Sequence, residues 1–390
     1  MFNTKTLMQI VLATLVLSAC SSHHELDKRV TERNYQQVAL IAEQSLSEPL
    51  RFWGNEAPNF LYDKDANTTV LRTSSNSLNI LALSGGGANG AYGAGIINGM
   101  YESGNLPDFA VVTGVSAGAL IAPFVFVGGD DIVTMKNIML GISDKRILAK
   151  RNYLNAVFKD GVSNGQGLNE FIAATFDEQM IAKIAATHNS GKRLFIGTTH
   201  FDSGRQVVWN LGQIAASEHP NKDQLIHQVL SASSSIPGIF PPQFIEVNAS
   251  GESLEEMHVD GGLSAQMFAD PAGFDYNNIA QALGINSSPN IYVVRNGRLD
   301  LPYQHLKDRG VELLGRSVQS LTLNQNRGDL YRILYFSEKH NFDTKFTYVT
   351  ANFTEKKKSK KMFDEDYMLA LYHYGYTKAI NQQQWHTELP

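Results

Sequence analysis

The chain of 390 residues has little cysteine, little net charge and no long apolar run. Cys20 is its only cysteine, which excludes an internal disulfide framework. With 33 basic and 38 acidic residues the net charge is −5, so the composition gives no reason to expect nucleic-acid binding. The sequence shows no cluster with metal-ligand spacing, and we expect neither a metal nor a cofactor. What remains is ordinary globular composition, 43% hydrophobic, with ample length for a large core.

The N-terminal residues have the form of a targeting segment. Lys5 precedes an apolar stretch at 7–17 that is too short to span a bilayer. Residues 17–20 read L-S-A-C and resemble the bacterial lipobox, which implies cleavage of a signal peptide at 1–19 and acylation of Cys20. Several acyl chains on one residue hold a protein stably on a membrane. The alternative is an ordinary signal peptide that ends near a chance cysteine.

The residue after Cys20 bears on the location of the anchored protein. The lipobox resemblance implies retention at the inner membrane when aspartate follows the cysteine, but here Ser21 follows. We therefore expect a lipid-anchored protein of the bacterial cell envelope, at the outer membrane.

The rest of the chain divides into three stretches. Residues 20–77 are expected to be a lipid-anchored tether, followed by a helix at 25–50 that packs on the main domain. Residues 78–300 alternate strand-like apolar runs with helical stretches, which predicts a three-layer α/β/α sandwich with a mainly parallel central sheet. Residues 301–390 are expected to be mostly helical and to pack on the catalytic domain. The runs that we assign to strands are 78–83, 109–113, 194–199, 206–209 and 291–294.

A short basic run, K-K-K-S-K-K, occupies residues 356–361 of the C-terminal stretch. It fits a solvated loop, and it also fits a contact with anionic lipid head groups. A closing amphipathic helix is expected directly after it, at 363–380.

The most informative motif is G-V-S-A-G at residues 114–118, between an apolar run at 109–113 and a small-residue run at 119–122. This pattern predicts a strand, a sharp turn and a helix, and a serine on such a turn is an exposed nucleophile. Gly114 and Gly118 leave room for the tight turn. The helix N-terminus favours negative charge that develops beside Ser116. Pro123 is expected to kink or shorten the helix.

A second match to the same pattern, G-V-S-N-G at residues 161–165, serves as an internal control. Lys159 and Asp160 precede it instead of an apolar strand end, and no small-residue helix follows. We therefore predict that Ser163 lies in a loop.

A glycine-rich motif, S-G-G-G-A-N-G at residues 84–90, follows the first strand. It literally fits the G-x-G-x-x-G fingerprint of dinucleotide-binding proteins. That interpretation requires an acidic residue at the end of the next strand, about 20 residues on, whereas Asp108 lies before that strand. The N–H groups of such a loop suit an oxyanion hole instead. We expect its donors among Gly85, Gly86, Gly87 and Ala88, within the motif that ends at Gly90.

A third motif, D-G-G at residues 260–262, follows Val259. Alone, Asp260, Gly261 and Gly262 would fit a plain β-turn. They also fit a tight loop that directs the carboxylate inward.

In order and spacing, the three motifs resemble the patatin-like phospholipase family. The serine-rich stretch at 231–242 and the hairpin at 198–204 add to the resemblance, which covers residues 78–263. It implies that Ser116 is the nucleophile, that Asp260 accepts its proton, and that water hydrolyses an acyl-enzyme. Burial is expected to raise the Asp260 pKa above its ordinary value of about 4. The family often has Arg or Lys where this chain has Asn89, so that cation is missing from the motif.

The resemblance implies a carboxylic ester hydrolase that acts on membrane phospholipid, lysophospholipid or a related acyl ester. Two alternatives stay open. One is an α/β-hydrolase-type esterase with a Ser-Asp-His triad, whose histidine would be sought after Asp260 in the chain. The other is a non-catalytic envelope lipoprotein. The downstream histidines are His305, His340, His373 and His386.

Overall fold

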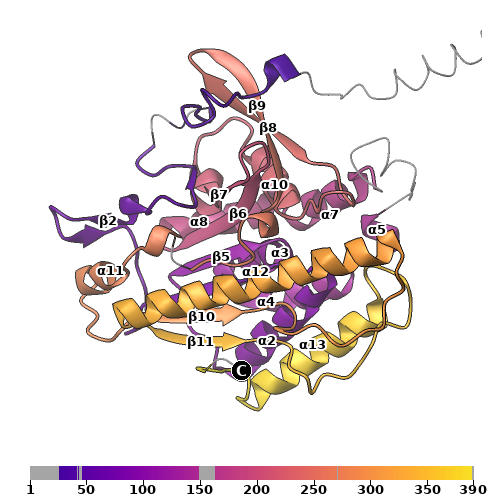
Figure 1. Cartoon of the computed structure of the whole chain (residues 1–390). Helices are drawn as coiled ribbons and strands as arrows, with labels where there is room; N and C mark the ends of the chain where they lie inside the picture. Colours follow the sequence, from indigo (N-terminus) through magenta and orange to yellow (C-terminus); the bar gives the residue numbers. More distant parts are fainter. Residues whose placement is uncertain (1–25, 42, 44–45, 149–162, 270, 389–390) are drawn as a thin grey trace, which may run out of the picture.

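The computed structural model describes residues 26–41, 43, 46–148, 163–269 and 271–388. Nine strands form one sheet, and two short strands form a separate hairpin. Figure 1 shows the sheet enclosed by helices. The strands are β1 (Arg51–Trp53), β2 (Tyr62–Asp63), β3 (Thr68–Thr69), β4 (Asn79–Leu83), β5 (Val111–Val115), β6 (Arg193–His200), β7 (Arg205–Asn210), β8 (Gln243–Ala249), β9 (Glu252–Asp260), β10 (Asn290–Val294) and β11 (Asp343–Thr347).

The helices lie mostly between strands that are parallel neighbours in the sheet, as crossover connections require. They are α2 (Gly90–Glu102), α3 (Ala117–Val127), α4 (Asp130–Leu140), α5 (Asp144–Ile147), α7 (Gln166–Thr175), α8 (Glu178–Asn189), α9 (Leu211–Ala216), α10 (Lys222–Ser233), α11 (Asn277–Ala282), α12 (Gly310–His340) and α13 (Glu365–Ile380). Single 3₁₀ turns occur at η1 (Leu26–Lys28), η3 (Asn59–Leu61), η4 (Gly87–Asn89), η5 (Gly261–Leu263) and η6 (Pro271–Gly273).

The centre of the sheet is parallel and one side of it is antiparallel. Strands β6, β5, β4, β10 and β11 run parallel in that order. Strands β7 and β9 both pair with β6 in the antiparallel direction. Leu83 lies beside Gly114, so the carboxyl ends of β4 and β5 meet at one edge. The loops after both strands therefore start at the same place.

Each central strand is buried on both faces, which explains its continuous apolar run. In β4, Leu81 and Leu83 belong to one core cluster, whereas Ile80 and Ala82 belong to the other. The first cluster includes side chains of α2, α3, α4, α8 and α13, and the second includes those of α11 and α12. The predicted three-layer α/β/α sandwich with a mainly parallel sheet is therefore confirmed.

The helix predicted at 25–50 is wrong for the described residues of that range. They form the 3₁₀ turn η1 and a series of turns. Backbone bridges tie Arg29 to Glu255 and Ala39 to Asn248, so the segment lies along the β8–β9 hairpin. Its apolar residues meet this hairpin instead of forming one helical face, and Val30 and Leu40 are buried there.

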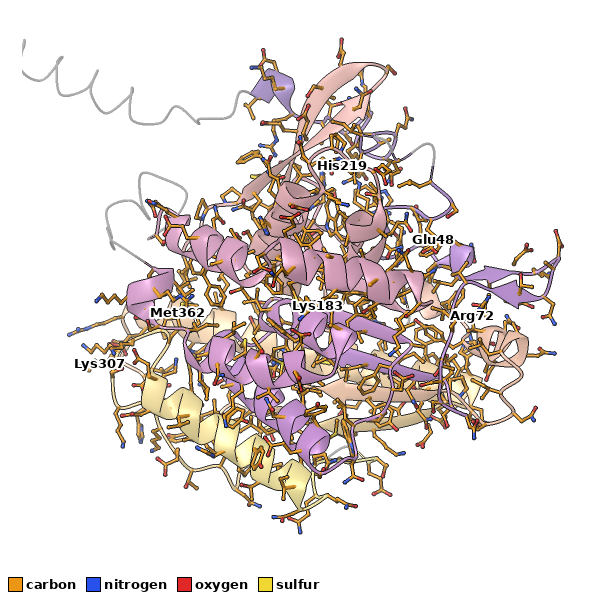
Figure 2. All side chains as sticks on the ribbon, turned by 180° about the vertical axis from the view of Figure 1, so that it is seen from behind. Glu48, Arg72, Lys183, His219, Lys307 and Met362 are labelled. Atoms are coloured by element: carbon orange, nitrogen blue, oxygen red, sulfur yellow. The ribbon has the colours of Figure 1, made fainter. Side chains whose placement is uncertain are left out.

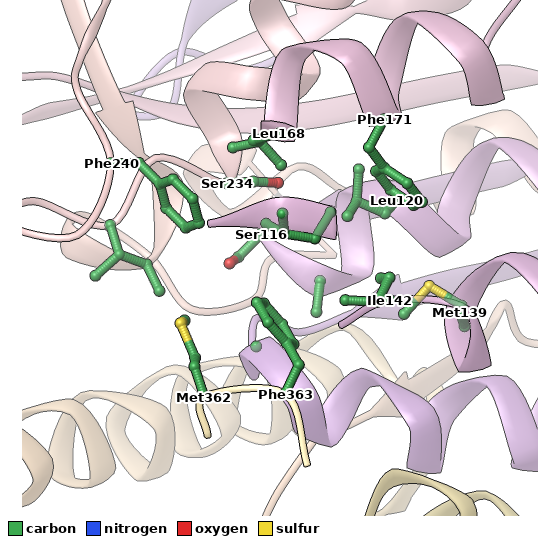
Figure 3. A pocket seen from close by; sticks show the side chains of 14 residues that line it. Ser116, Leu120, Met139, Ile142, Leu168, Phe171, Ser234, Phe240, Met362 and Phe363 are labelled. Carbon is green, nitrogen blue, oxygen red and sulfur yellow. The ribbon is translucent and has the colours of Figure 1, made fainter. Parts of the chain in front are cut away.

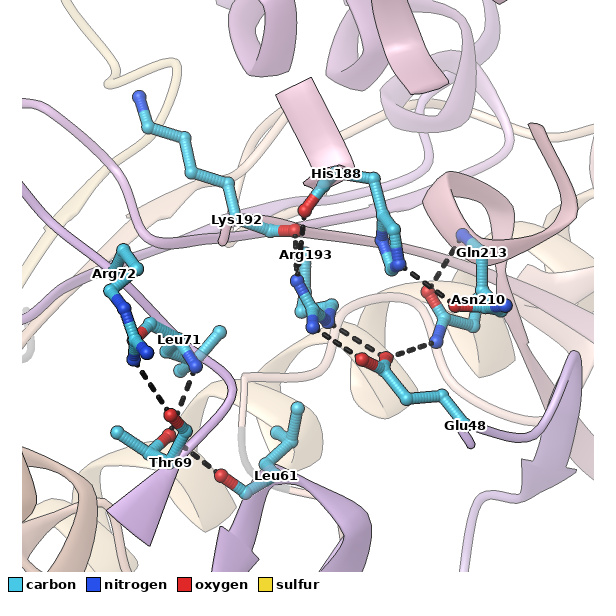
Figure 4. Close-up of polar contacts among 10 residues, drawn as sticks. All are labelled: Glu48, Leu61, Thr69, Leu71, Arg72, His188, Lys192, Arg193, Asn210 and Gln213. Atoms are coloured by element: carbon cyan, nitrogen blue, oxygen red, sulfur yellow. Dashed lines mark hydrogen bonds and ion pairs between the residues drawn. The ribbon is translucent and has the colours of Figure 1, made fainter. Parts of the chain in front are cut away.

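A buried ion pair fixes the end of this segment to the sheet. The Glu48 carboxylate accepts hydrogen bonds from the Arg193 guanidinium and, at 3.2 Å, from the Asn210 side-chain amide (Figure 4). Glu48 and Arg193 are only 5% and 3% exposed. Arg193 begins β6, so the N-terminal segment is held against the start of a central strand.

The C-terminal stretch contributes a strand as well as helices. The closing helix is confirmed as α13, which packs along α2. The sequence analysis did not predict β11, which extends the sheet beside β10, across the expected boundary at residue 300. Pro123 lies within α3, which ends four residues later at Val127. Among the described residues, no helix combines the length and apolarity needed to cross a membrane.

Candidate active site

Ser116 lies between the last residue of β5 and the first residue of α3. Its backbone has φ 53° and ψ −121°, a strained conformation for a residue with a side chain. The two flanking glycines are packed against backbone. A Cβ on Gly114 would lie 2.6 Å from the Gly118 carbonyl oxygen, and one on Gly118 would lie 2.2 Å from that of Leu83. The predicted strand, turn and helix are confirmed, and they place Ser116 at a helix N-terminus.

Asp260 comes from a distant part of the chain to meet this serine. It ends β9, and its Oδ2 accepts a hydrogen bond of 2.7 Å from the Ser116 hydroxyl. Its Oδ1 accepts one of 2.7 Å from the N–H of Gly262. Gly261 is pressed against β6, where a Cβ would lie 2.3 Å from the Gly197 carbonyl oxygen. The structure thus brings together the two side chains to which the sequence analysis assigned the chemistry.

The surroundings of Asp260 raise its pKa to about 6. Burial is the main cause because it disfavours the charged carboxylate, while the hydrogen bonds from Ser116 and Gly262 oppose the shift. This carboxylate forms no ion pair with any described residue. A carboxylate with a pKa near 6 is a stronger base than an exposed aspartate, yet it is largely ionised at pH 7.

The serine-rich stretch at 231–242 connects the two halves of the site. The Ser233 hydroxyl accepts a hydrogen bond of 2.9 Å from the Ser116 N–H and donates one of 2.7 Å to the Gly197 carbonyl. Two residues on, the Ser235 carbonyl accepts the Asp260 N–H at 3.0 Å. The sequence analysis noted this stretch only as part of a family resemblance. Its serines hold the backbones of Ser116 and Asp260 in place.

The glycine loop lies directly against Ser116, but one of its four predicted donors, Gly85, already has a partner. A Cβ on Gly85 would lie 3.3 Å from the Ser116 Cβ. The Gly85 N–H is not free to bind an oxyanion, because it donates to the Gln266 carbonyl at 3.0 Å. No hydrogen bond to a described residue uses the N–H groups of Gly86 and Gly87. Gly87 has φ +54° and lines the same pocket as Ser116.

A buried arginine behind the loop was missed by the sequence analysis. Arg295, directly after β10, donates through one nitrogen to the Gly85 carbonyl at 2.8 Å and to the Ser84 hydroxyl at 3.2 Å. Burial lowers its pKa to about 10. Arg295 thus places a cation behind the loop, although Asn89 itself carries no charge. Its only signal in the sequence is its place, immediately after a buried parallel strand.

An apolar pocket opens beside the serine (Figure 3). Its walls come from α3, α4, α7, the loop after α10 and the residues just before α13. Ser234 is the other serine in the wall, and its buried hydroxyl has no hydrogen-bond partner among the described residues. The lining side chains are otherwise apolar and include Leu120, Met139, Ile142, Leu168, Phe171, Phe240, Met362 and Phe363.

No described histidine forms a hydrogen bond with Ser116 or Asp260. His258, two residues before Asp260, bonds instead to Thr198 and Glu256. Burial lowers the pKa of His200 to about 4. The direct bond between Ser116 and Asp260 occupies the position that a triad gives to histidine. Of the downstream histidines, His340 pairs with Asp275 and His386 packs on Phe346.

Ser163 lies in a loop, as predicted, just before α7. Its hydroxyl donates to the Leu148 carbonyl at 3.1 Å and accepts the Gly165 N–H at 3.2 Å. Cys20 lies outside the described residues. Within the described ranges, no group of three or more histidine, cysteine, aspartate or glutamate side chains is arranged to hold a metal.

Comparison with known proteins gives a match to one family. Residues 81–272 match the family model described as patatin-like phospholipase, and the match includes all three motifs. A patatin-like phospholipase domain-containing protein of Pyricularia oryzae is 25% identical over 246 residues, which cover 59% of this chain and 29% of that protein. A patatin-like phospholipase domain-containing protein of Chaetomium globosum is also 25% identical over 246 residues, which cover 59% of this chain and 27% of that protein. The chain thus spans less than a third of the length of these relatives.

Two solved structures also resemble the chain. The crystal structure of VipD from Legionella pneumophila has a TM-score of 0.39 and 14% identity, covering 79% of this chain and 67% of that one. The crystal structure of the type III effector protein ExoU has a TM-score of 0.37 and 13% identity, covering 79% and 53%. The family match therefore identifies residues 81–272, about half of this chain, as a patatin-like phospholipase domain.

Proposed function

We propose that the protein is a serine acyl hydrolase that cleaves phospholipid or lysophospholipid esters through a Ser116–Asp260 dyad. The observation that carries the proposal is the 2.7 Å hydrogen bond to the buried Asp260 from the hydroxyl of Ser116, which lines an apolar pocket. Family membership supports the reaction class.

The first step is attack by Ser116 on the ester carbonyl. As the new carbon–oxygen bond forms, the hydroxyl proton moves to Asp260 Oδ2, and this proton then passes to the alcohol that leaves. Water then attacks the acyl carbon and gives a proton to Asp260, which passes it to the Ser116 oxygen as the acyl–oxygen bond breaks and the fatty acid leaves. The raised pKa of Asp260 suits both roles, since a group near the working pH accepts and returns a proton with little cost.

The glycine loop stabilises the oxyanion of the tetrahedral intermediate. Gly86 and Gly87 offer the N–H groups that no described residue uses, and α3 adds the positive end of its dipole. Arg295 acts on the loop from behind. Its bond to the Gly85 carbonyl orients the peptide unit whose other end is the Gly86 N–H. A trans peptide directs these two groups to opposite sides, so the N–H faces away from the arginine.

The pocket supports an acyl-chain substrate. Its lining is nearly all apolar side chains, and it begins at the nucleophile (Figure 3). A fatty acyl chain placed there buries apolar surface at about 25 cal/mol per Å².

Fatty acid release from mixed envelope lipids tests the proposal. The purified protein should release free fatty acid, and Asp260→Asn should release none above background. Ser163→Ala is the matched control and should behave like the wild type. If the Asp260→Asn protein were folded and as active as the wild type, the dyad would be wrong. Inactivity of the wild type on every acyl ester would favour a non-catalytic protein.

We also propose that Cys20 is acylated and holds the protein in the bacterial cell envelope, at the outer membrane. Only the sequence supports this. Mass spectrometry of the protein from membranes should find diacylglyceryl and acyl groups on an N-terminal Cys20, and Cys20→Ala should leave the membrane fraction. Recovery of an unmodified Cys20 would exclude the anchor without affecting the hydrolase.

A further inference from the structure

The two halves of α12 are buried very differently. The second half docks on the sheet through a row of buried residues at helical spacing, namely Asn326, Leu330, Ile333 and Ser337. Between 310 and 321, none of the described side chains is buried. Four apolar residues are exposed there, Leu313 by 47%, Leu314 by 67%, Val318 by 55% and Leu321 by 70%. Such a concentration of exposed apolar side chains marks an interaction site.

This exposed half lies at the end of the molecule that carries the active site. In Figure 1, the N-terminal end of α12 lies near α5, on the side toward which the parallel strands point. Figure 2 shows Lys307 and Met362 at that same end. A groove lined by Val318 of α12, Tyr367 of α13 and Asn89 of the glycine loop links the helix to the site. The exposed half of α12 and the acyl pocket therefore lie at the same end of the molecule.

Basic residues surround the apolar stripe. Lys307, Arg309 and Arg316 lie within or just before it, together with the acidic residues Asp308 and Glu312. The run at 356–361 adds five lysines, is flanked by the acidic residues Glu355, Asp364, Glu365 and Asp366, and leads directly into Met362 and Phe363 of the pocket wall. Lys361 pairs with Glu365, whereas Lys356, Lys358 and Lys360 form no ion pair with a described residue. With these neighbours the two segments carry eight basic and six acidic residues, and on a chain of net charge −5 this local basic excess favours contact with an anionic surface.

We propose that residues 303–321 and 356–361 form a surface that docks on anionic phospholipid membranes. The apolar stripe of α12 inserts at the boundary between head groups and acyl chains, and the lysines contact the head groups. This inference rests on the proposed function, because docking in this way would turn the active-site pocket toward the lipid. A second copy of the chain is the other possible occupant, but repulsion between two lysine-rich faces disfavours it.

Vesicle sedimentation tests the surface apart from the chemistry. All variants are made in a full-length Cys20→Ala background, so that an acyl anchor does not contribute. The Cys20→Ala protein, with no change in the docking surface, should bind vesicles of phosphatidylcholine and phosphatidylglycerol more tightly than vesicles of phosphatidylcholine alone. High salt should weaken this binding. Leu314→Glu with Leu321→Glu should weaken this binding at least tenfold. Lys358→Gln with Lys360→Gln should reduce the preference for phosphatidylglycerol.

The matched control is Val133→Glu on α4. Val133 is 42% exposed, and its neighbour Asp131 pairs with Lys183 on the face shown in Figure 2. This variant should bind vesicles like the background protein. All variants should cleave a soluble short-chain ester within twofold of each other, which shows that the dyad is intact.

Two results would overturn the docking surface. One is unchanged vesicle binding by the Leu314→Glu, Leu321→Glu protein. The other is a dimer in size-exclusion chromatography that this double substitution dissociates while vesicle binding stays the same, since the stripe would then cover a second copy. Failure of the dyad would appear instead as loss of soluble-ester cleavage in every variant, including the background protein.

Discussion

Two serines of this chain stand in the same five-residue pattern, yet only one has chemistry around it. Ser116 and Ser163 are both nearly buried, at 6% and 2% exposed. Ser116 donates to a carboxylate with a raised pKa and opens onto an apolar pocket, whereas Ser163 donates to a backbone carbonyl. The difference shows that the motif describes a turn, and that the strand before it and the aspartate opposite it determine what the serine does.

The largest effect is expected from Ser116→Ala. Removal of the nucleophile leaves no atom to form the acyl-enzyme, and losses of about 10⁴- to 10⁶-fold in kcat are typical of such changes. Steady-state fatty acid release measures the loss, and circular dichroism checks the fold. Substantial remaining activity in a folded Ser116→Ala protein would remove the contrast with Ser163.

The next effect is expected from Gly118→Ala. The added Cβ would meet two backbone carbonyl oxygens, 2.2 Å from that of Leu83 and 2.8 Å from that of Ser84, and neither is a movable side chain. Overpacking of this kind costs about 1–3 kcal/mol and displaces the turn. We expect a lower Tm and a loss of activity of at least tenfold. A Gly118→Ala protein with wild-type Tm and activity would contradict the close packing of the turn.

The pH dependence should come from Asp260. Its pKa of about 6 predicts that kcat/KM falls about tenfold for each pH unit below that value, because the protonated carboxyl cannot accept the Ser116 proton. A pH profile of the Ser163→Ala protein should show the same inflection. An inflection near 4 instead would mean that Asp260 is not desolvated.

The same shift has a consequence for stability. The folded state raises the pKa of Asp260, so the folded protein binds this proton more tightly than the unfolded chain does. The charged carboxylate therefore destabilises the fold as the pH rises from about 4 to about 6. Asp260→Asn should raise the free energy of unfolding at pH 8 by up to about 3 kcal/mol and should change it little at pH 4. Denaturant unfolding at both pH values measures this, and an equal change at both would contradict it.

The smallest effects are expected from substitutions that each remove one hydrogen bond, at Ser233 beside Ser116 and at Ser163 itself. Ser233→Ala removes the acceptor of the Ser116 N–H and should cost about 1 kcal/mol, seen as a lower kcat with little change in KM. Ser163→Ala removes a similar bond from a loop and should lower the stability by about 1 kcal/mol with kcat unchanged. Equal losses of kcat in the two variants would contradict the assignment.

The sequence was informative where burial is continuous. Strands β4 and β5 are buried on both faces, so their apolar runs, followed by glycines, located Ser116 and the glycine loop correctly. Asp260 was found through its glycines. The helix predicted at 25–50 was wrong because the apolar residues of this segment lie along the β8–β9 hairpin. Helical periodicity in the sequence does not reveal such a partner. Strand β11 was missed because Asp343–Thr347 is mostly polar.

The residues that contact the glycine loop from other elements could not be predicted from the sequence, because these contacts form only in the folded structure. Arg295 acts on a loop some 210 positions earlier in the chain, and Gln266 takes the Gly85 N–H that the motif alone suggested was free. Neither contact leaves a local pattern in the sequence. The residues to which we assign the chemistry stood in short motifs, whereas those that contact them came from elements that the fold brings together.

Labelling with a fluorophosphonate probe, followed by peptide mapping, tests the central claim most directly. The probe reacts with serines that are activated as nucleophiles, so both serines compete for it in one protein. We expect a single adduct on the peptide that contains Ser116, which is lost in Ser116→Ala, strongly reduced in Asp260→Asn and unchanged in Ser163→Ala. An adduct on Ser163, or full labelling of Ser116 without Asp260, would contradict the dyad.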